Sequence, residues 1–197
     1  MSPILGARGG LSASAYGLFA PSTAVAGTYE SIATVTGSGA NSVTFSSLGS
    51  YMNLQIRANV RCTGASGTSL LWWRVNGNST TTNYTSHGLG GDGSTAFAYN
   101  LGSSYGMGLI GSTAHSGSTT NTFSGIIVDI FDYANTSKNT TVRSIRGEDY
   151  VTTGEIRIAS SAFFQTTAVT SLTIGFLDNG GSQFATNSSI ALYGIKG

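Results

Sequence analysis

One stretch near the middle of the chain, residues 123–147, constrains the fold most, because it reads as two long strands joined by a turn. Over residues 123–133, β-branched and aromatic residues are too dense for a surface strand, whereas Asp129 and Asp132 are too frequent for a membrane span. Residues 135–139 are rich in turn formers, so the chain should reverse there and pair the two strands. We therefore expect a mostly buried central hairpin on which the core is built.

Shorter strands are expected on both sides of this hairpin. They are placed at residues 30–36, 42–48, 54–61, 70–75, 155–160, 169–176 and 189–195, with weak strands near Tyr84, at 97–99 and at 107–110. Helical periodicity of useful length is absent, and 197 residues with 40% hydrophobic content suit one domain with a proper core. The pattern predicts an all-β fold, an antiparallel β-sandwich that is jelly-roll-like, with a plain barrel as the alternative.

Turn signals add detail to the connections between these strands. Residues 30–36 and 42–48 flank a segment of Gly, Ser, Ala and Asn, which suits two short strands joined by a turn. Asn76 and Gly77 form the strongest short hairpin signal in the chain. Residues 79–122 carry polar blocks around weak strands, and we expect mostly long loops there.

Side-chain alternation predicts which residues face the core. Over residues 54–61 apolar and polar residues alternate without error, so one face is core, and Arg57 and Arg61 share a solvated face. In the strand that begins at residue 155, Ile156 and Ile158 are expected to point inward.

Two consecutive tryptophans, Trp72 and Trp73, must point to opposite faces of their strand. One of them therefore lies outside the main core. It could cover a sheet edge or sit in a subunit contact, where tryptophan is enriched. Both residues are candidates for such a contact, and the pattern does not tell which of them faces the core.

The first 27 residues differ from the rest of the chain, because glycine, proline, serine and alanine surround a few apolar residues. We expect an extended N-terminal arm over residues 1–27 and a β-sandwich domain over residues 28–197. An exposed arm of this kind would be an aggregation risk, so it should dock on a partner. The candidate anchoring residues are Ile4, Leu5, Arg8, Leu11, Tyr16, Leu18 and Phe19.

Charge and cysteine content exclude several classes of partner. Only 9% of the residues are charged, against roughly 25% in an ordinary soluble domain, and nine basic against eight acidic residues leave a net charge of +1. Such a surface has no field to attract phosphates, so nucleic acid is not an expected partner. Cys62 is the single cysteine and should be a small buried residue. Neither a secretory signal nor a membrane span is apparent, so we expect a soluble protein without a membrane partner.

Motifs with catalytic associations occur in the wrong context. Residues 88–93 and 106–111 both spell G-x-G-x-x-G, but neither opens a predicted helix, which a nucleotide site needs. Residues 102–106 spell G-x-S-x-G without the strand-to-helix turn of a nucleophile elbow. His87 and His115 each stand alone in polar segments and are expected to be solvated.

The carboxylates are no better placed for chemistry. Asp129 and Asp132 are three positions apart and Glu148 and Asp149 are adjacent, so neither pair shares a strand face as an acid/base pair would. Metal ligation has no support, because no two histidine or cysteine residues lie at ligand spacing. We expect no catalytic residue, no cofactor and no metal.

Several segments of the chain resemble a family of small structural proteins of tailed bacteriophages that are common in aquatic phages. The resemblance covers about residues 29–197 and is carried by residues 29–34, 42–48, 54–57, 127–136, 141–144 and 191–197. Residues 4–17 look like a leader found on several phage virion proteins with different bodies, which implies a virion anchor.

The resemblance implies a non-enzymatic virion protein, assembled in the host cytoplasm, and an outer capsid decoration (cement) protein is the leading hypothesis. Its partner would be the major capsid protein, to which the arm fastens the sandwich. The alternative is a tail-fibre or tail-associated module that joins tail proteins and binds a host receptor or glycan. A homo-oligomer such as a trimer suits both. The short chain, without a long repeat or coiled coil for a fibre shaft, favours decoration.

Overall fold

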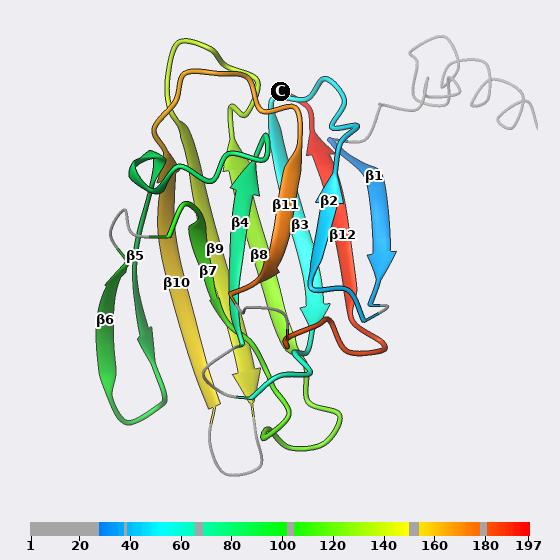
Figure 1. The fold of residues 1–197 in the computed structure, drawn as a ribbon, viewed down its shortest axis with the longest axis vertical. Helices are drawn as coiled ribbons and strands as arrows, with labels where there is room; N and C mark the ends of the chain where they lie inside the picture. The colour runs from blue at the N-terminus through cyan, green and yellow to red at the C-terminus, as the bar shows by residue number, and fades with distance from the viewer. Residues whose placement is uncertain (1–27, 38, 66–68, 102–104, 150–153, 178–180) are drawn as a thin grey trace, which may run out of the picture.

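The computed structural model describes residues 28–37, 39–65, 69–101, 105–149, 154–177 and 181–197. The strands are β1 Tyr29–Thr36, β2 Ser42–Phe45, β3 Asn53–Val60, β4 Leu70–Val75, β5 Tyr84–Gly91, β6 Ala96–Leu101, β7 Gly108–Ser112, β8 Ser124–Phe131, β9 Thr140–Asp149, β10 Gly154–Phe163, β11 Leu172–Phe176 and β12 Ser189–Ile195. Sheet A has the order β1-β12-β3-β8-β9-β10-β5-β6, and sheet B has the order β2-β11-β4-β7. Figure 1 shows β4 and β11 in front of β8 and β3.

The two antiparallel sheets confirm the all-β, jelly-roll-like sandwich. Both sheets are open and end in edge strands, so the barrel alternative is wrong. The described part of the chain has one helical turn, η2 Thr81–Asn83, and contains no helix of the length and apolarity that crossing a membrane requires.

Aromatic residues from both sheets fill the core between them. The ring centroids of Trp73 in β4 and Tyr84 in β5 lie 5.5 Å apart, and Phe163 in β10 lies 5.1 Å from Tyr84. A Cβ atom on Gly108 in β7 would lie 2.1 Å from the Trp73 indole nitrogen, so the close approach of this ring requires glycine. Cys62 is fully buried, as expected.

The central hairpin is confirmed, with β8 paired to β9 from Gly125 opposite Gly147 to Phe131 opposite Thr141. β10 continues it into a meander of three consecutive strands in sheet A. The expectation that β8, the first strand of this hairpin, is mostly buried is wrong, because buried and more exposed residues alternate along it and Ile127 is 40% exposed. Only one face of β8 meets sheet B, so its outward residues remain at the surface.

The two strands expected on either side of residues 37–41 form, but they do not pair with each other. β1 is an edge strand of sheet A beside β12, and β2 is an edge strand of sheet B beside β11. The intervening segment is therefore a crossing between sheets. A turn-forming composition is equally compatible with a hairpin and with such a crossing.

The turn at Asn76-Gly77 forms, but not a hairpin. Both residues have positive φ, 52° and 63°, and the Asn78 amide donates to the Val75 carbonyl at 2.8 Å, as the primed two-residue turn requires. β4 nevertheless pairs with β11 and β7, while the chain crosses to β5 in sheet A. Neighbouring strands of sheet B already occupy both edges of β4.

Residues 79–122 are more regular than the long loops expected there. The weak strand signals correspond to β5, β6 and β7, of which β5 and β6 form a hairpin at the edge of sheet A. Neither G-x-G-x-x-G motif opens a helix: residues 88–91 belong to β5, and residues 108–111 belong to β7. The nucleotide motif is therefore a chance match in a glycine-rich β-protein.

Arg57 and Arg61 differ in their surroundings. The exposed Arg57 donates from Nε to Gln55 Oε1 at 2.8 Å and lies between the rings of Tyr29 and Tyr193, 5.3 and 5.4 Å from their centroids. The solvated face predicted for Arg61 is wrong. Its guanidinium is partly buried, and Nη1 donates to the carbonyls of Thr119 and Thr122 at 2.9 Å, because the loop before β8 folds over this end of sheet A.

Candidate functional site

The outward and inward faces of β10 are reversed relative to the sequence expectation. Ile156 and Ile158 are 55% and 47% exposed, so the prediction that they point inward is wrong. Glu155 and Arg157, which alternate with them, lie on the face toward sheet B instead. The reversal places charged residues between the sheets and isoleucines on the outside, and it creates two features that a function could use.

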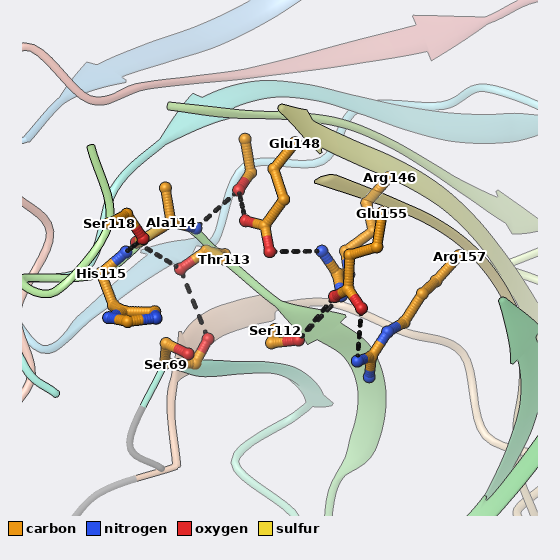
Figure 2. A network of polar contacts seen from close by, with 11 residues as sticks. Ser69, Ser112, Thr113, Ala114, His115, Ser118, Arg146, Glu148, Glu155 and Arg157 are labelled. Carbon is orange, nitrogen blue, oxygen red and sulfur yellow. Dashed lines mark hydrogen bonds and ion pairs between the residues drawn. The ribbon is translucent and has the colours of Figure 1, made fainter. Parts of the chain in front are cut away.

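The first feature is a charged cluster between the sheets, centred on Arg146 in β9 (Figure 2). Its guanidinium is fully buried and forms ion pairs with Glu148, 3.2 Å from Nη1, and with Glu155, which contacts Nη2. Nη2 also donates to Ser112 Oγ at 2.7 Å. Arg157 Nη2 contacts the second Glu155 oxygen at 2.8 Å, so two arginines and two glutamates neutralise one another.

Residues of β7 in sheet B and of β6 in the β5–β6 hairpin contact the arginines of this cluster. β7 carries a register shift against β4 and a glycine, Gly111, at φ 142°, where a Cβ atom would lie 2.6 Å from Arg146 Nε. At the far end, Phe97 and Tyr99 in β6 face the Arg157 guanidinium, with ring centroids 4.8 and 5.6 Å from its carbon. The arginines are thus held by rings and by a close backbone approach as well as by carboxylates.

The carboxylates of the cluster already have hydrogen-bond partners within the domain. Ser124 Oγ donates to Glu148 at 2.5 Å and in turn accepts from the Ala114 amide at 2.7 Å. Burial acts to raise the pKa of Glu155, but hydrogen bonds from Arg157 and Arg146 outweigh it, and its pKa lies below the usual value of 4.5. An ionised carboxylate fixed between two arginines is neither a proton donor at neutral pH nor an available base. The cluster therefore links β9 and β10 of sheet A to β7 of sheet B.

Acid should destabilise the fold through this glutamate. Because the Glu155 pKa is lowered in the folded state, its contribution to stability is fully present above the unfolded value of 4.5 and is lost as the pH falls through the folded value. We expect the urea midpoint to be flat from pH 7 to about pH 5 and to drop below that. In the Glu155→Gln variant the midpoint should be lower at pH 7, and its decrease in acid should be shallower. An equally steep decrease in that variant would contradict the assignment.

The second feature is an apolar row on the outer face of sheet A. Ile127, Ile145, Ile158 and Leu89 are direct cross-strand neighbours on β8, β9, β10 and β5, with 40%, 41%, 47% and 60% of their surface exposed. We call these four residues the outer apolar row. A contiguous exposed apolar patch on a β-sandwich is typical of an interaction surface rather than of an exterior that faces only water.

A shallow hollow of about 630 Å³ lies beside this row. Its lining includes Gly125, Gly147, Ile127, Ile145, Ile156 and Arg57. Gly125 and Gly147 are opposite each other on β8 and β9 and form part of its floor. A Cβ atom on Gly125 would meet nothing within 4 Å, and one on Gly147 would meet only a carbonyl oxygen 4.0 Å away. Packing inside the domain therefore does not require glycine at either position.

The tryptophans point to opposite faces of sheet B, as predicted, and Trp73 is the one in the core. Trp72 lies outside the core but is only 8% exposed, because Arg74 lies 5.0 Å from its ring centroid and Gly175 leaves room for it on β11. The exposed tryptophan that a subunit contact would need is therefore absent at both positions. The subunit contact itself stays a prediction.

The remaining candidate residues are dispersed. Exposed His87 lies on β5, whereas His115 lies in the turn before β8, where its Nδ1 accepts from the Gly117 amide at 3.1 Å. Asp129 on β8 accepts from Gln55 at 2.7 Å, and Asp132 pairs with Lys138 in the following turn. In the described ranges no three His, Cys, Asp or Glu residues form a group able to hold a metal.

Two sets of predicted residues lie outside the described residues. One is the arm over residues 1–27, with its anchors Ile4, Leu5, Arg8, Leu11, Tyr16, Leu18 and Phe19, and the other is the centre of the G-x-S-x-G motif at residues 102–104. Among the carboxylates, Glu148 is buried and Asp149 exposed, which confirms that these adjacent residues face opposite sides.

Sequence reasoning missed both the charged cluster and the outer apolar row. A signal was available, because Arg146 and Glu148 are two positions apart in one strand, and in the next strand Glu155 and Arg157 alternate with Ile156 and Ile158. This alternation shows that one face is charged and the other apolar. It does not show which face a second sheet covers.

Comparisons with protein-family models, curated proteins and solved structures found no match to this chain. The resemblance to phage structural proteins therefore stays a prediction.

Proposed function

We propose that this protein is a non-enzymatic structural protein of a bacteriophage particle, a decoration protein that docks on the outer capsid. The observation that carries the proposal is the outer apolar row on sheet A, set against a charged cluster whose groups neutralise one another between the sheets. Apolar side chains on a rigid sheet are suited to binding another protein surface. The sequence resemblance supplies the kind of partner, which is the shell of the particle.

The catalytic alternatives have less support. Within the described residues the carboxylates between the sheets are held by arginines and serine, and the two histidines lie on separate elements. A receptor-binding module would be expected to present long loops on its scaffold, but most of the described residues between 84 and 112 belong to β5, β6 and β7. Docking through a sheet face therefore fits the described residues better than binding through loops.

Replacing Ile158 by aspartate should prevent incorporation into the particle. The side chain is half exposed, so the charge costs the fold little, but burying it against the shell would leave an unpaired carboxylate. The copy number on purified particles, measured from gel bands, should fall at least about tenfold, which corresponds to about 1.4 kcal/mol of binding free energy. The matched control is Ser160→Asp, an exposed position on the same face of the same strand that is not in the row.

The wild-type protein should appear on the gel as a band comparable to that of the major capsid protein. Particles that lack it should lose shell integrity on heating but still adsorb to cells. A few tens of copies per particle, or loss of adsorption with an intact shell, would favour the tail module instead. Normal incorporation of Ile158→Asp would refute docking through this face.

A further inference from the structure

The hollow on sheet A has features of a site that another segment of polypeptide fills. Its floor includes Gly125 and Gly147, which keep side chains out of it although the domain has room for them there. Its wall includes Ile127, Ile145 and Ile156, all at least 40% exposed. Backbone brought close to a glycine floor, with apolar side chains against the isoleucines, would bury this surface.

The exposed lining of the hollow is mostly apolar. Arg57, a charged residue in the lining of the hollow, contacts the rings of Tyr29 and Tyr193 and donates to Gln55. The Tyr193 ring, which could serve as a platform for a sugar, is the ring on one side of that guanidinium. A polar small molecule would find few free partners here, whereas an uncharged apolar segment needs none.

The chain itself contains a segment of that composition. Between Arg8 and Glu30 no residue is charged, and residues 11–19 place Leu11, Tyr16, Leu18 and Phe19 among serine, alanine and glycine. The small residues can lie against a glycine floor, and the larger ones can pack beside isoleucines. Residues 11–19 therefore match the hollow in polarity, and their small and large side chains match its floor and its wall.

We propose that residues 11–19 of the same chain lie in the hollow beside the outer apolar row. The contact completes the outer face of sheet A in the free protein. It does not depend on the proposed function, because it concerns the free protein before that face meets any partner.

The start of β1 is placed for this contact. The Tyr29 ring lies against the guanidinium of Arg57, a residue that lines the hollow, and the Thr28 carbonyl accepts a hydrogen bond from the Lys196 amide at 3.0 Å. Gly147 is four strands across the sheet and six residues along it from Tyr29, about 28 Å away at usual strand spacings. The nine residues 20–28 can span about 30 Å when extended. Residues 11–19 then fall over the hollow.

The same chain is favoured over a second copy for a physical reason. A segment tethered by a short linker has an effective concentration of about millimolar, far above the concentration of other copies in a dilute solution. Since the linker can reach, the intramolecular contact forms first.

Cleavage of the arm by chymotrypsin in the free, full-length protein tests the proposal. The enzyme cuts after Tyr16, Leu18 and Phe19, and the fragments are followed by mass spectrometry. In the wild-type protein these bonds should be cut at least about tenfold more slowly than in a synthetic peptide of residues 1–27, because protection follows the population of the undocked form. Filling the hollow with Gly125→Leu and Gly147→Leu should bring the rate to within about twofold of the peptide.

Two controls separate docking from damage to the fold. Neither glycine has a positive φ, and both face open space, so the double variant should keep a cooperative melting transition. Thr44→Leu introduces the same residue at an exposed position of β2 in sheet B and should leave the arm protected.

Three results would overturn the proposal. Cleavage of the wild-type arm as fast as the free peptide would show that nothing holds it. Protection that persists in the folded double variant would place the arm elsewhere. Protection that grows with protein concentration, together with a dimer in solution, would assign the arm in the hollow to a second copy.

Discussion

Replacing Arg146 by methionine should lower the free energy of unfolding by about 3–5 kcal/mol, the usual cost of breaking a buried ion pair by removing one partner. Arg146 is fully buried, and its guanidinium contacts both Glu148 and Glu155. Without it, the Glu148 carboxylate remains between the sheets with Ser124 as its hydrogen-bond partner. For a domain of this size the thermal midpoint should fall by about 10 °C.

The matched control is Arg143→Met, three residues away on the opposite, exposed face of β9. Its guanidinium lies 5.8 Å from the Phe131 ring centroid, so the loss should stay within about 1 kcal/mol. Both values come from urea titrations at pH 7, where the carboxylates are ionised. Equal losses in the two variants would mean that the cluster does not organise the space between the sheets.

Deleting residues 2–26 should abolish incorporation into the particle while leaving the sandwich folded. The first strand of sheet A begins at Tyr29, and the β1 ladder to β12 starts there, so no described strand is lost. The removed segment carries the arm's apolar anchors, and under the proposed function these leave the hollow on sheet A and fasten the protein to the shell. The expected result is a cooperative unfolding transition with a β-type circular dichroism spectrum and no band on purified particles.

A chain of full length in which Leu11, Leu18 and Phe19 are replaced by serine is the matched control for arm length. It should behave like the deletion, because the anchors and not the number of residues carry the contact. Normal incorporation of the deleted protein would refute the anchoring role. An unfolded deletion variant would show instead that the arm belongs to the fold.

The positions of the strands could be predicted because they rest on local patterns. Alternation, β-branched residues and turn formers give the hairpin of β8 and β9 and the turn at Asn76-Gly77, whose positive φ values are set by the two residues themselves. Pairing partners could not be predicted in the same way. β4 meets β11 and β7 because a second sheet forms around it, and the residues of the turn do not encode that sheet.

The charged cluster and the outer apolar row could not be predicted for the same reason. Arg146 and Glu148 in β9, and Glu155 and Arg157 in β10, are visible in the sequence as alternating charges. Hydrophobicity then assigned Ile156 and Ile158 to the core, since burial of apolar residues is the general rule. Here the rule fails locally, because paired charges and ring contacts make the other face suitable for burial.

By itself the sequence determined that this chain is all-β and where its strands lie, and it showed that β10 has one face with Glu155 and Arg157 and another with Ile156 and Ile158. Only the tertiary structure decided which face lies inside. Alternation with a period of two sorts the residues of a strand onto two faces but does not show which face is buried. Which face is buried therefore depends on the residues that sheet B places opposite. Gly111 on β7 leaves room for Arg146 and Ser112 accepts a hydrogen bond from it, while the antiparallel register puts Glu155 opposite Glu148, from where it contacts Arg146 diagonally. With the charges paired inside, the isoleucines are left on the surface for another surface to cover.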